Sequence, residues 1–356
     1  MRPSSIESFQ EIRKQWGNRL LILGHYYVPD ETLALTDRQG DSLALARFAQ
    51  SNDDCRAIVF CGVHFMAETA DILANAPEKI QARGGVRIPV ILPEMGAGCP
   101  MADMASRPQV EACWETLESL FVADREITPV TYVNSSADIK AFCGRHGGVV
   151  CTSSNARQVL EWALSRRPRV LFLPDQHLGR NTAIQMGYTP ADMVLWNRET
   201  GATPDALKTA KFILWDGYCP VHHQMTPEMV DASCTMLPNA KLVVHPECRQ
   251  EVVSQSFGNG STSYLISAIQ KAPAGDAYIV GTEAHLVNRL RAEHPELTIH
   301  HLGQEHVCED MARNTRDALF AAVENLNAAT PTHLVAVPDA VAADARIALE
   351  NMLRLN

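Results

Sequence analysis

The sequence lacks any apolar run that approaches the ~18 residues needed by a membrane-spanning helix. It also lacks a basic excess, because 31 Lys and Arg residues face 41 Asp and Glu residues and leave a net charge of −10. The N-terminus, MRPSSIESFQEIRKQWG, has no apolar core of the kind found in secretory signals. We therefore expect a cytoplasmic protein that binds neither nucleic acid nor membrane.

Cys-x-x-Cys pairs are absent although the chain has ten cysteines. This excludes the ordinary zinc-ribbon spacing, and without an export signal the thiols are expected to be reduced. The remaining composition is that of a globular protein, with 46% hydrophobic and 20% charged residues, which excludes disordered and fibrous classes. A length of 356 residues corresponds to two or three domains at ~150 residues each.

Short β-branched runs alternate with helix-length amphipathic segments along the chain. The runs are continuously apolar, as in parallel strands that are covered on both faces, so the order predicts an α/β protein. The tail 340–356 reads as a closing helix. The predicted strands are 20–24, 57–62, 89–93, 130–134, 148–152, 169–174, 212–215, 241–246 and 277–281.

The chain repeats one pattern three times. Each unit has a strand that ends in an aromatic or histidine residue, then a helix start with serine, then a second strand followed by histidine. The Ser-to-His intervals are 22, 24 and 24 residues. The strand ends are His25, Tyr132 and His245, the serines are Ser42, Ser153 and Ser261, and the later histidines are His64, His177 and His285.

One cysteine follows each of the later histidines, at intervals of 35, 42 and 23 residues. We expect three similar three-layer α/β/α units with parallel sheets around a pseudo-threefold axis. The alternative is a single large sheet with accidental echoes. The expected units are 1–105 with Cys99, 106–225 with Cys219, and 226–356 with Cys308 and the C-terminal helix.

Helix starts that carry serine are suited to hold anions, because unpaired N–H groups and the helix dipole favour negative charge there. Ser42, Ser153 and the Ser261/Thr262 pair are therefore candidates for binding carboxylate or phosphate. The alternative is plain N-capping. In parallel sheets such groups gather at the carboxyl ends of the strands.

One cysteine per unit suggests three thiolates that converge on a metal, and an iron–sulfur cluster with three thiolates would keep one iron open as a Lewis acid. The alternative is that all are buried, unliganded thiols, and Cys248 is a possible rival ligand. Glu247 and Tyr27 are candidate acid and base groups. A carboxylate in a closed apolar cavity can have a raised pKa, which suits a general base.

The strings GHYY, GDSLALAR, CGVHFMAETA, AGCPMAD, YVNSSADIKA, DQHLGR, HPE and GSTSYLI resemble those of the quinolinate synthase family of bacterial NAD biosynthesis. The resemblance runs from about residue 20 to the final helix. It implies three α/β/α units and one [4Fe-4S] cluster per chain, held by Cys99, Cys219 and Cys308. It also implies the condensation of iminosuccinate with dihydroxyacetone phosphate to quinolinate, with loss of phosphate and two waters.

The same resemblance assigns roles to individual residues. Tyr27 is similar to the family's proton-relay tyrosine and Glu247 to its general base, with His245 beside it. L-aspartate oxidase is the implied source of iminosuccinate. Two features depart from many members: Cys308 has no neighbouring cysteine, and Val28 replaces an expected glutamine. The implied substrate-binding residues are His25, Ser42, Tyr132, Val133, Asn134, Ser153, His245, Pro246, Glu247 and Thr262.

Two other functions remain open from the sequence. One is a different open-cluster [4Fe-4S] dehydratase, or a related radical enzyme. The other is a non-enzymatic iron–sulfur sensor or a zinc-holding interaction module. A sensor would need a surface for DNA or a partner, and the acidic composition offers no basic patch.

Overall fold

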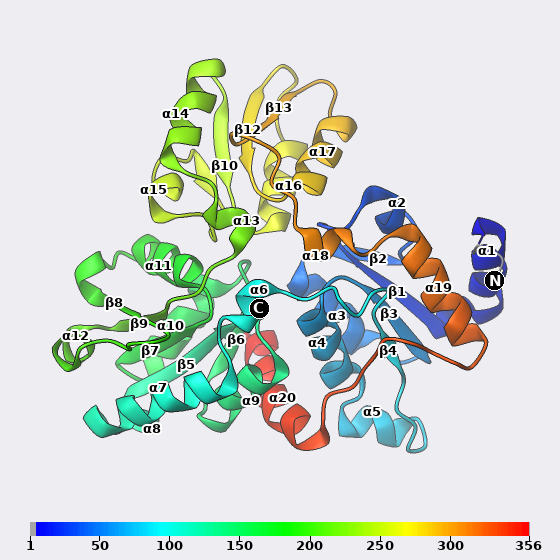
Figure 1. Ribbon diagram of the computed structural model, residues 1–356, viewed down its shortest axis with the longest axis horizontal. Helices are drawn as coiled ribbons and strands as arrows, with labels where there is room; N and C mark the ends of the chain where they lie inside the picture. Colours follow the sequence, from blue (N-terminus) through cyan, green and yellow to red (C-terminus); the bar gives the residue numbers. More distant parts are fainter. Residues whose placement is uncertain (1–4, 356) are drawn as a thin grey trace. The chain divides into compact units, whose positions relative to one another are not determined.

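The computed structural model describes residues 5–355 and shows an α/β chain with three sheets (Figure 1). In the described part of the chain, every strand pair within these sheets is parallel except β14 with β4. The strands are β1 (Leu20–His25), β2 (Arg38–Gly40), β3 (Ala57–Cys61), β4 (Val90–Ile91), β5 (Ile127–Tyr132), β6 (Val149–Cys151), β7 (Arg169–Leu173), β8 (Met193–Trp196), β9 (Phe212–Trp215), β10 (Lys241–Val244), β11 (Gly258–Asn259), β12 (Ala277–Gly281), β13 (Thr298–His301) and β14 (Leu334–Val335).

The three sheets share one strand order. It is β2-β1-β3-β4 in the first, β6-β5-β7-β9 in the second and β11-β10-β12-β13 in the third. In each sheet the first strand of the repeat lies between the second and the third. Beyond this common order, β14 extends the first sheet and β8 extends the second. The expected α/β class with three similar units is therefore confirmed, and the repeat seen in the sequence corresponds to a repeat in topology.

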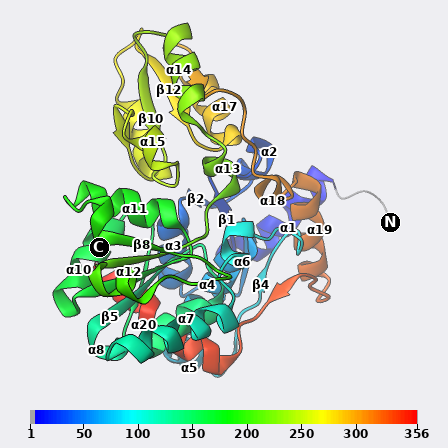
Figure 2. The same cartoon turned by 60° about the vertical axis from the view of Figure 1, so that its left-hand side comes forward.

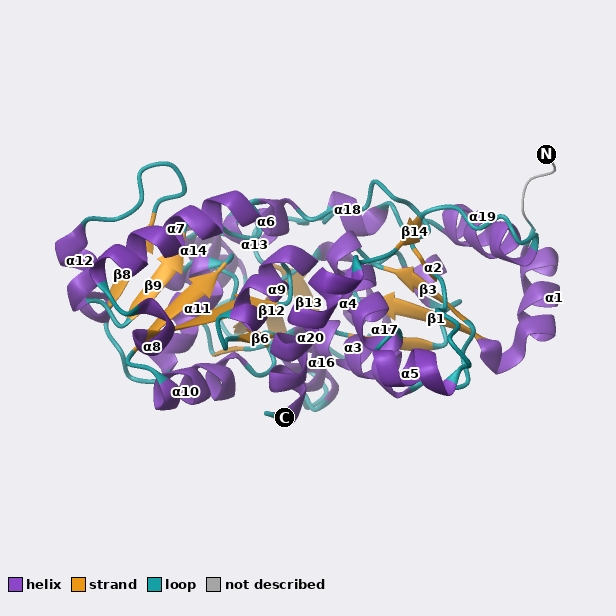
Figure 3. Cartoon of the chain, turned by 90° about the horizontal axis from the view of Figure 1, so that it is seen from below, coloured by secondary structure: helices purple, strands orange, loops and turns teal. Residues whose placement is uncertain are grey.

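Helices connect the strands in each sheet, and Figure 3 shows strands of the second sheet with helices on either side. The helices are α1 (Ile6–Trp16), α2 (Asp30–Leu33), α3 (Ser42–Ser51), α4 (His64–Ala74), α5 (Pro77–Ala82), α6 (Pro100–Asp103), α7 (Arg107–Leu120), α8 (Ala123–Glu126), α9 (Ala137–Arg145), α10 (Ala156–Arg166), α11 (Gln176–Gln185), α12 (Pro204–Thr209), α13 (Pro220–His223), α14 (Pro227–Met236), α15 (Gln250–Val253), α16 (Thr262–Gln270), α17 (Ala284–Glu293), α18 (Glu309–Ala312), α19 (Arg316–Asn327) and α20 (Asp339–Arg354).

The central strands are buried along their whole length, which explains their continuously apolar sequences. Every residue of β1, β3 and β5 is buried. In the third sheet β10 and β12 run side by side (Figure 2), and Val244 pairs with Gly281 at their carboxyl ends. Parallel strands that are covered by helices on both faces require this composition.

The chain divides into two compact units. Unit 1 comprises residues 1–99 and 307–339 and contains the first sheet, whereas unit 2 comprises residues 100–306 and 340–356 and contains the second and third sheets. The sequence assigns 307–339 to the third segment. In the structure these residues instead supply β14 to the first sheet and place Phe320 of α19 against Phe9 of α1, with ring centroids 4.8 Å apart.

The closing helix α20 forms as expected, and it packs in unit 2 against α9. Gly144 allows this close approach, because a Cβ atom there would lie 1.9 Å from the carbonyl oxygen of Asp344. Arg145 also pairs with Asp344 at 3.3 Å. None of the helices in residues 5–355 combines the length and apolar character needed to cross a membrane.

Candidate active site

The three cysteines expected as ligands occupy equivalent local structures. Each directly precedes a helix of four residues: Cys99 precedes α6, Cys219 precedes α13 and Cys308 precedes α18. Proline follows the first two and glutamate the third, and both residue types are favoured at a helix start. All three cysteines are half-buried.

The same backbone hydrogen bond anchors each cysteine loop. The N–H of the first residue of α4, α11 or α17 donates to the carbonyl oxygen two positions before the cysteine. The distances are 2.9 Å for His64 to Ala97, 2.9 Å for Gln176 to Gly217 and 2.9 Å for Ala284 to His306. This repeat identifies Cys99, Cys219 and Cys308 as corresponding positions without reference to any other protein.

This equivalence corrects the register of one predicted motif. The sequence aligns His64 with His177 and His285, but the hydrogen bonds align His64 with Gln176 and Ala284. His177 and His285 are the second residues of their helices, whereas His64 is the first. The interval of 22 rather than 24 residues between Ser42 and His64 was a visible sign of the shift.

Six of the other cysteines are buried thiols and fit the structural interpretation. Burial raises the pKa of Cys55, Cys61, Cys113, Cys143, Cys151 and Cys248, which disfavours the thiolate that binds metal. Cys248 is not a rival ligand, because its Sγ lies in the third unit's core, 3.6 Å from Sδ of Met225. Cys234 is half-buried and packs against the same core.

A buried cluster of polar side chains surrounds Glu247 in unit 2. Its Oε2 atom lies 2.7 Å from Nδ1 of His222 and 3.4 Å from Nδ1 of His245. The two imidazole rings stack with centroids 4.6 Å apart, and Tyr132 hydrogen-bonds to the carboxylate. The ligand atoms of Glu247, His222 and Cys219 all lie within 4.8 Å of one another.

The ionisation of Glu247 differs from the expectation. Burial alone would raise the pKa of Glu247. The charges of His245 and His222, and hydrogen bonds from His222 and Tyr132, outweigh burial and lower it. The prediction of a pKa raised toward neutrality was therefore wrong. The sequence shows one of these histidines beside Glu247 but not the stacking of both rings against it.

Two oxygens in this part of unit 2 have acceptor capacity left over. Oε1 of Glu247 and Oδ1 of Asn134 are buried and lack a hydrogen-bond partner among the described residues. Buried acceptors are normally paired, so such atoms are candidates to contact a ligand. Val133, between Tyr132 and Asn134, is buried and donates its N–H to the carbonyl of Cys151 at 2.8 Å.

The turn that carries His245, Pro246 and Glu247 is fixed by Asn181 of α11. The side-chain amide of Asn181 donates to the carbonyl oxygens of Pro246 and Cys248, at 2.8 Å each. Asp175 caps the same helix and accepts the N–H of His177 at 2.6 Å. It also accepts the backbone N–H of Cys219, so α11 supports both the cysteine loop and the His-Pro-Glu turn.

The serine and threonine candidates differ in their local roles. Asp41 caps α3 and Ser261 caps α16, so the side chains of Ser42 and Thr262, each the first residue of its helix, are not needed as caps. Ser153 lies before the cap position of α10, in a turn that Asn155 closes by accepting the N–H of Thr152 at 2.7 Å. Plain N-capping therefore describes Ser261 but not Ser42, Ser153 or Thr262.

His25 and Tyr27 lie at the carboxyl end of β1 in unit 1. His25 is buried and its ring meets that of Tyr27 edge-on, with centroids 4.8 Å apart. The N–H of Tyr27 donates to Nδ1 of His25 at 3.2 Å. His25 and Tyr132 each end the first strand of their sheets, and His245 directly follows β10.

Sequence reasoning missed His222, Asn181 and Asp175. His222 is 1% exposed, and its Nε2 hydrogen-bonds to Oγ1 of Thr282 at 3.2 Å. Its signal in the sequence was the Cys-x-x-His spacing from Cys219, which places both residues on one short helical turn. Asn181 and Asp175 gave no comparable signal, because their partners are backbone groups from distant segments.

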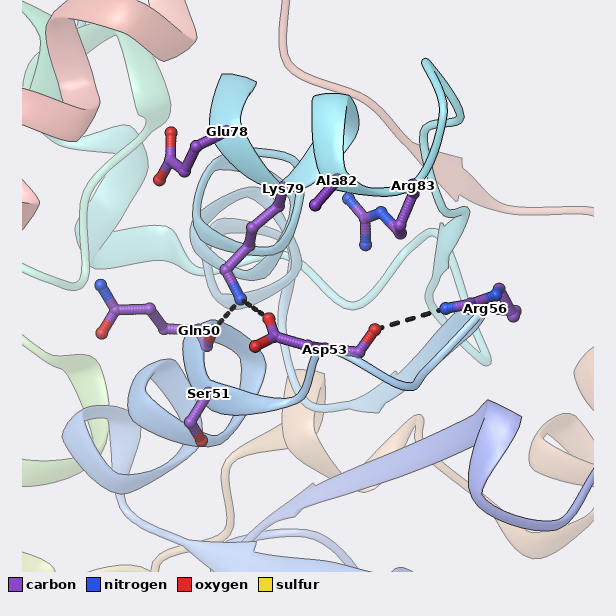
Figure 4. Close-up of a pocket in the computed structure, with 8 residues that line it drawn as sticks. All are labelled: Gln50, Ser51, Asp53, Arg56, Glu78, Lys79, Ala82 and Arg83. Carbon is purple, nitrogen blue, oxygen red and sulfur yellow. Dashed lines mark hydrogen bonds and ion pairs between the residues drawn. The ribbon is translucent and has the colours of Figure 1, made fainter.

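A separate hollow of about 650 Å³ lies in unit 1 (Figure 4) and is lined by none of the candidate residues. Its cations serve the chain itself. Lys79 donates to Oδ1 of Asp53 at 2.6 Å and also to the carbonyl of Gln50, while Arg56 donates to the carbonyl of Asp53 at 3.3 Å. These bonds close the loop after α3, and we assign the hollow no ligand.

The chain matches a family model described as "Quinolinate synthetase A protein" over residues 7–354. The chain belongs to the quinolinate synthase family. Similar proteins named quinolinate synthase include that of Rhodopirellula baltica, 47% identical over 352 residues that cover 98% of this chain and 90% of the relative. That of Corynebacterium glutamicum is 47% identical and covers 97% and 86%. The Bacillus subtilis protein is 43% identical and covers 97% and 91%. The expected family is confirmed, as is the expectation that the chain is an enzyme.

Proposed function

We propose that the chain condenses iminosuccinate with dihydroxyacetone phosphate to give quinolinate, phosphate and two waters, as a step of NAD biosynthesis. Membership of the quinolinate synthase family over residues 7–354 carries this proposal. The acidic cluster around Glu247 and the helix starts at Ser42 and Thr262 are consistent with anionic substrates that undergo proton transfer.

We further propose that one [4Fe-4S] cluster is held by the thiolates of Cys99, Cys219 and Cys308. Two observations support this donor set: the three cysteines share one local structure and one anchoring hydrogen bond, and they are more exposed than the six buried thiols. When bound, such a cluster supplies an open iron, a Lewis acid that helps an oxygen leave as water.

The chain's own residues would bind the substrates and move protons. Glu247 is ionised at neutral pH because its pKa is lowered, so it is ready to accept a proton and to hold the imidazoles of His222 and His245 in place. Tyr132 donates to the same carboxylate. Tyr27, beside His25 at the end of β1, is the proposed proton relay in unit 1.

The remaining substrate-binding residues are those expected from the sequence. In unit 2, Asn134 offers a buried oxygen, while Ser153 and Thr262 offer hydroxyl groups at helix starts. Val133 and Pro246 contribute apolar and backbone contacts. In unit 1, His25 and Ser42 complete the set. Each of these groups can bind a carboxylate, a phosphate or a hydroxyl through a hydrogen bond.

Cluster thiolates persist only under reducing conditions, so we propose a cytoplasmic location. Iminosuccinate would be supplied by L-aspartate oxidase.

Metal analysis of protein purified without oxygen tests the proposal. About four iron and four acid-labile sulfide per chain are expected, followed by formation of quinolinate from the two substrates. Protein with no sulfide would remove the proposed chemistry, even though the family fold remained.

The cluster of Cys219, His222 and Glu247 supports a second candidate. Sulfur, nitrogen and oxygen donors within 4.8 Å of one another are a set that binds zinc. A zinc content of about one per chain, without sulfide, would favour this site over the cluster.

A further inference from the structure

Asn314 is fully buried in unit 1, and its side-chain amide pairs with the backbone of Gly62 as a strand would. Its Nδ2 donates to the carbonyl oxygen of Gly62 at 2.9 Å, and its Oδ1 accepts the N–H of Gly62 at 3.0 Å. Nδ2 also donates to the carbonyl of Met311 at 3.1 Å, and the carbonyl of Asn314 accepts the hydroxyl of Thr32 at 2.7 Å.

These bonds join two loops that are far apart in the sequence. Met311 belongs to α18, the short helix that follows Cys308. Gly62 follows β3 and lies two residues before His64, whose N–H holds the carbonyl of Ala97 in the other cysteine loop. Asn314 therefore links the segment of Cys308 to the segment that anchors Cys99.

A second bond closes the connection. The N–H of Gly98, adjacent to Cys99, donates to Oδ1 of Asp310 at 3.2 Å, and Asp310 lies two residues after Cys308. The two cysteine loops of unit 1 are thus tied directly through Asp310 and indirectly through Asn314.

The amide of Asn314 is costly to remove. Gly62 would be left with an unpaired N–H and an unpaired carbonyl in a buried position, and each such group costs about 1–3 kcal/mol. Its bonding partners are backbone groups at three points near the cysteine loops, so its loss would loosen their relative position rather than empty a substrate contact.

We propose that Asn314 is a positioning residue that fixes Cys99 and Cys308 relative to each other as thiolate ligands. This inference depends on the proposed cluster. Residues that orient metal ligands through hydrogen bonds typically change metal retention by about 10–100-fold when they are removed.

Asn314→Ala tests the proposal, and Asn75→Ala is its matched control. Asn75 is also buried in unit 1 and pairs with both backbone groups of one residue: Nδ2 donates to the carbonyl of Ile88 at 3.0 Å, and Oδ1 accepts its N–H at 2.9 Å. It caps the carboxyl end of α4, whereas Gly62 precedes the amino end of that helix. The two variants lose similar bonds at different distances from the cysteines along α4.

The measurements are iron release to a chelator without oxygen, the EPR spectrum of the reduced cluster, and hydrogen exchange of the cluster-free protein. Asn314→Ala should release iron about 10-fold faster than the wild type, alter the EPR spectrum, and exchange faster at 96–99 and 307–312. Asn75→Ala should keep the wild-type release rate and spectrum despite a lower melting temperature.

Equal release rates and spectra for the two variants would overturn the role of Asn314. If Asn314→Ala does not fold, Asp310→Ala removes the bond to Gly98 and should show the same faster release; wild-type release in that variant would also overturn it. A wild type without sulfide would instead refute the proposed cluster. Hydrogen exchange in the cluster-free protein would still test the link between the loops.

Discussion

The imidazole rings of His222 and His245 stack at 4.6 Å, and both present Nδ1 to the same carboxylate oxygen of Glu247. This arrangement combines groups from α13 and from the turn after β10. It keeps Glu247 charged in a buried position, where a lone carboxylate would be neutral. The chemistry of the site therefore depends on a triad of which the sequence reveals only the His-Pro-Glu part.

Glu247→Gln should abolish most turnover while the protein keeps its iron and sulfide. The amide can no longer accept a proton, and loss of a general base typically lowers kcat by about 100-fold or more. Steady-state assays with metal analysis of the same sample check this. Glu251→Gln, an exposed carboxylate on α15, serves as the control and should retain wild-type kcat. A Glu247→Gln enzyme with normal kcat would rule out a proton-transfer role.

Cys219→Ala should lose the cluster and all activity yet remain folded, because its half-buried thiol contributes little to the core. Cys248→Ala offers the opposite test. That thiol is fully buried, so its loss should lower stability by about 1 kcal/mol while iron content stays at the wild-type level. Iron and sulfide analysis with thermal melts distinguishes the two. Full iron in Cys219→Ala would contradict the ligand assignment.

Asn181→Ala should destabilise unit 2 by about 2 kcal/mol, since two buried carbonyl groups at the His-Pro-Glu turn would lose their donor. Urea denaturation measures the change. Asn325→Ala is a suitable comparison, because it loses only a solvent-exposed hydrogen bond to Thr332 and should change stability by less than about 0.5 kcal/mol. Equal effects would show that Asn181 does not hold the turn.

His301 should make unit 2 sensitive to acid. Burial, aided by the charge of Arg291, lowers the pKa of His301 from 6.5 to about 4. Because the folded pKa lies below the unfolded one, the unfolded chain binds the proton first as the pH falls. Stability is therefore fully present above pH 6.5 and is lost between 6.5 and about 4.

His301→Gln should reduce that loss by about 2 kcal/mol, which is less than the full shift implies because solvent screens part of it. The comparison is between urea midpoints of wild type and variant at pH 7.5 and near pH 4.5. Gln can still donate to Oδ1 of Asn288, the partner of His301 at 2.9 Å. An unchanged pH dependence would show that His301 is not a source of the acid sensitivity.

The sequence predicts the central strands well and the edge strands poorly. All nine apolar runs form strands, whereas β2, β8, β11, β13 and β14 were missed, and each of these lies at the edge of its sheet. Edge strands are short and partly solvated, so they lack the continuous apolar sequence that marks buried parallel strands. In β2, for example, Arg38 and Gln39 are exposed and only Gly40 is buried.

The candidate site shows the same division. Cysteine spacing and strand ends are local features, and they led to Cys99, Cys219 and Cys308 and to the His-Pro-Glu turn. The pKa of Glu247 depends on His222, which approaches from another segment, and no local pattern encodes that approach. The support from Asn181 is equally invisible, because its partners are backbone carbonyls 65 and 67 residues away.

The return of residues 307–339 to the first sheet has a consequence for synthesis of the chain. Asp71 of α4 accepts the N–H of Val337 at 2.9 Å, β14 pairs with β4, and Phe320 covers Phe9. A ribosome would release the first 99 residues long before these partners exist. Unit 1 is therefore begun first and completed last, after both sheets of unit 2 have already been translated.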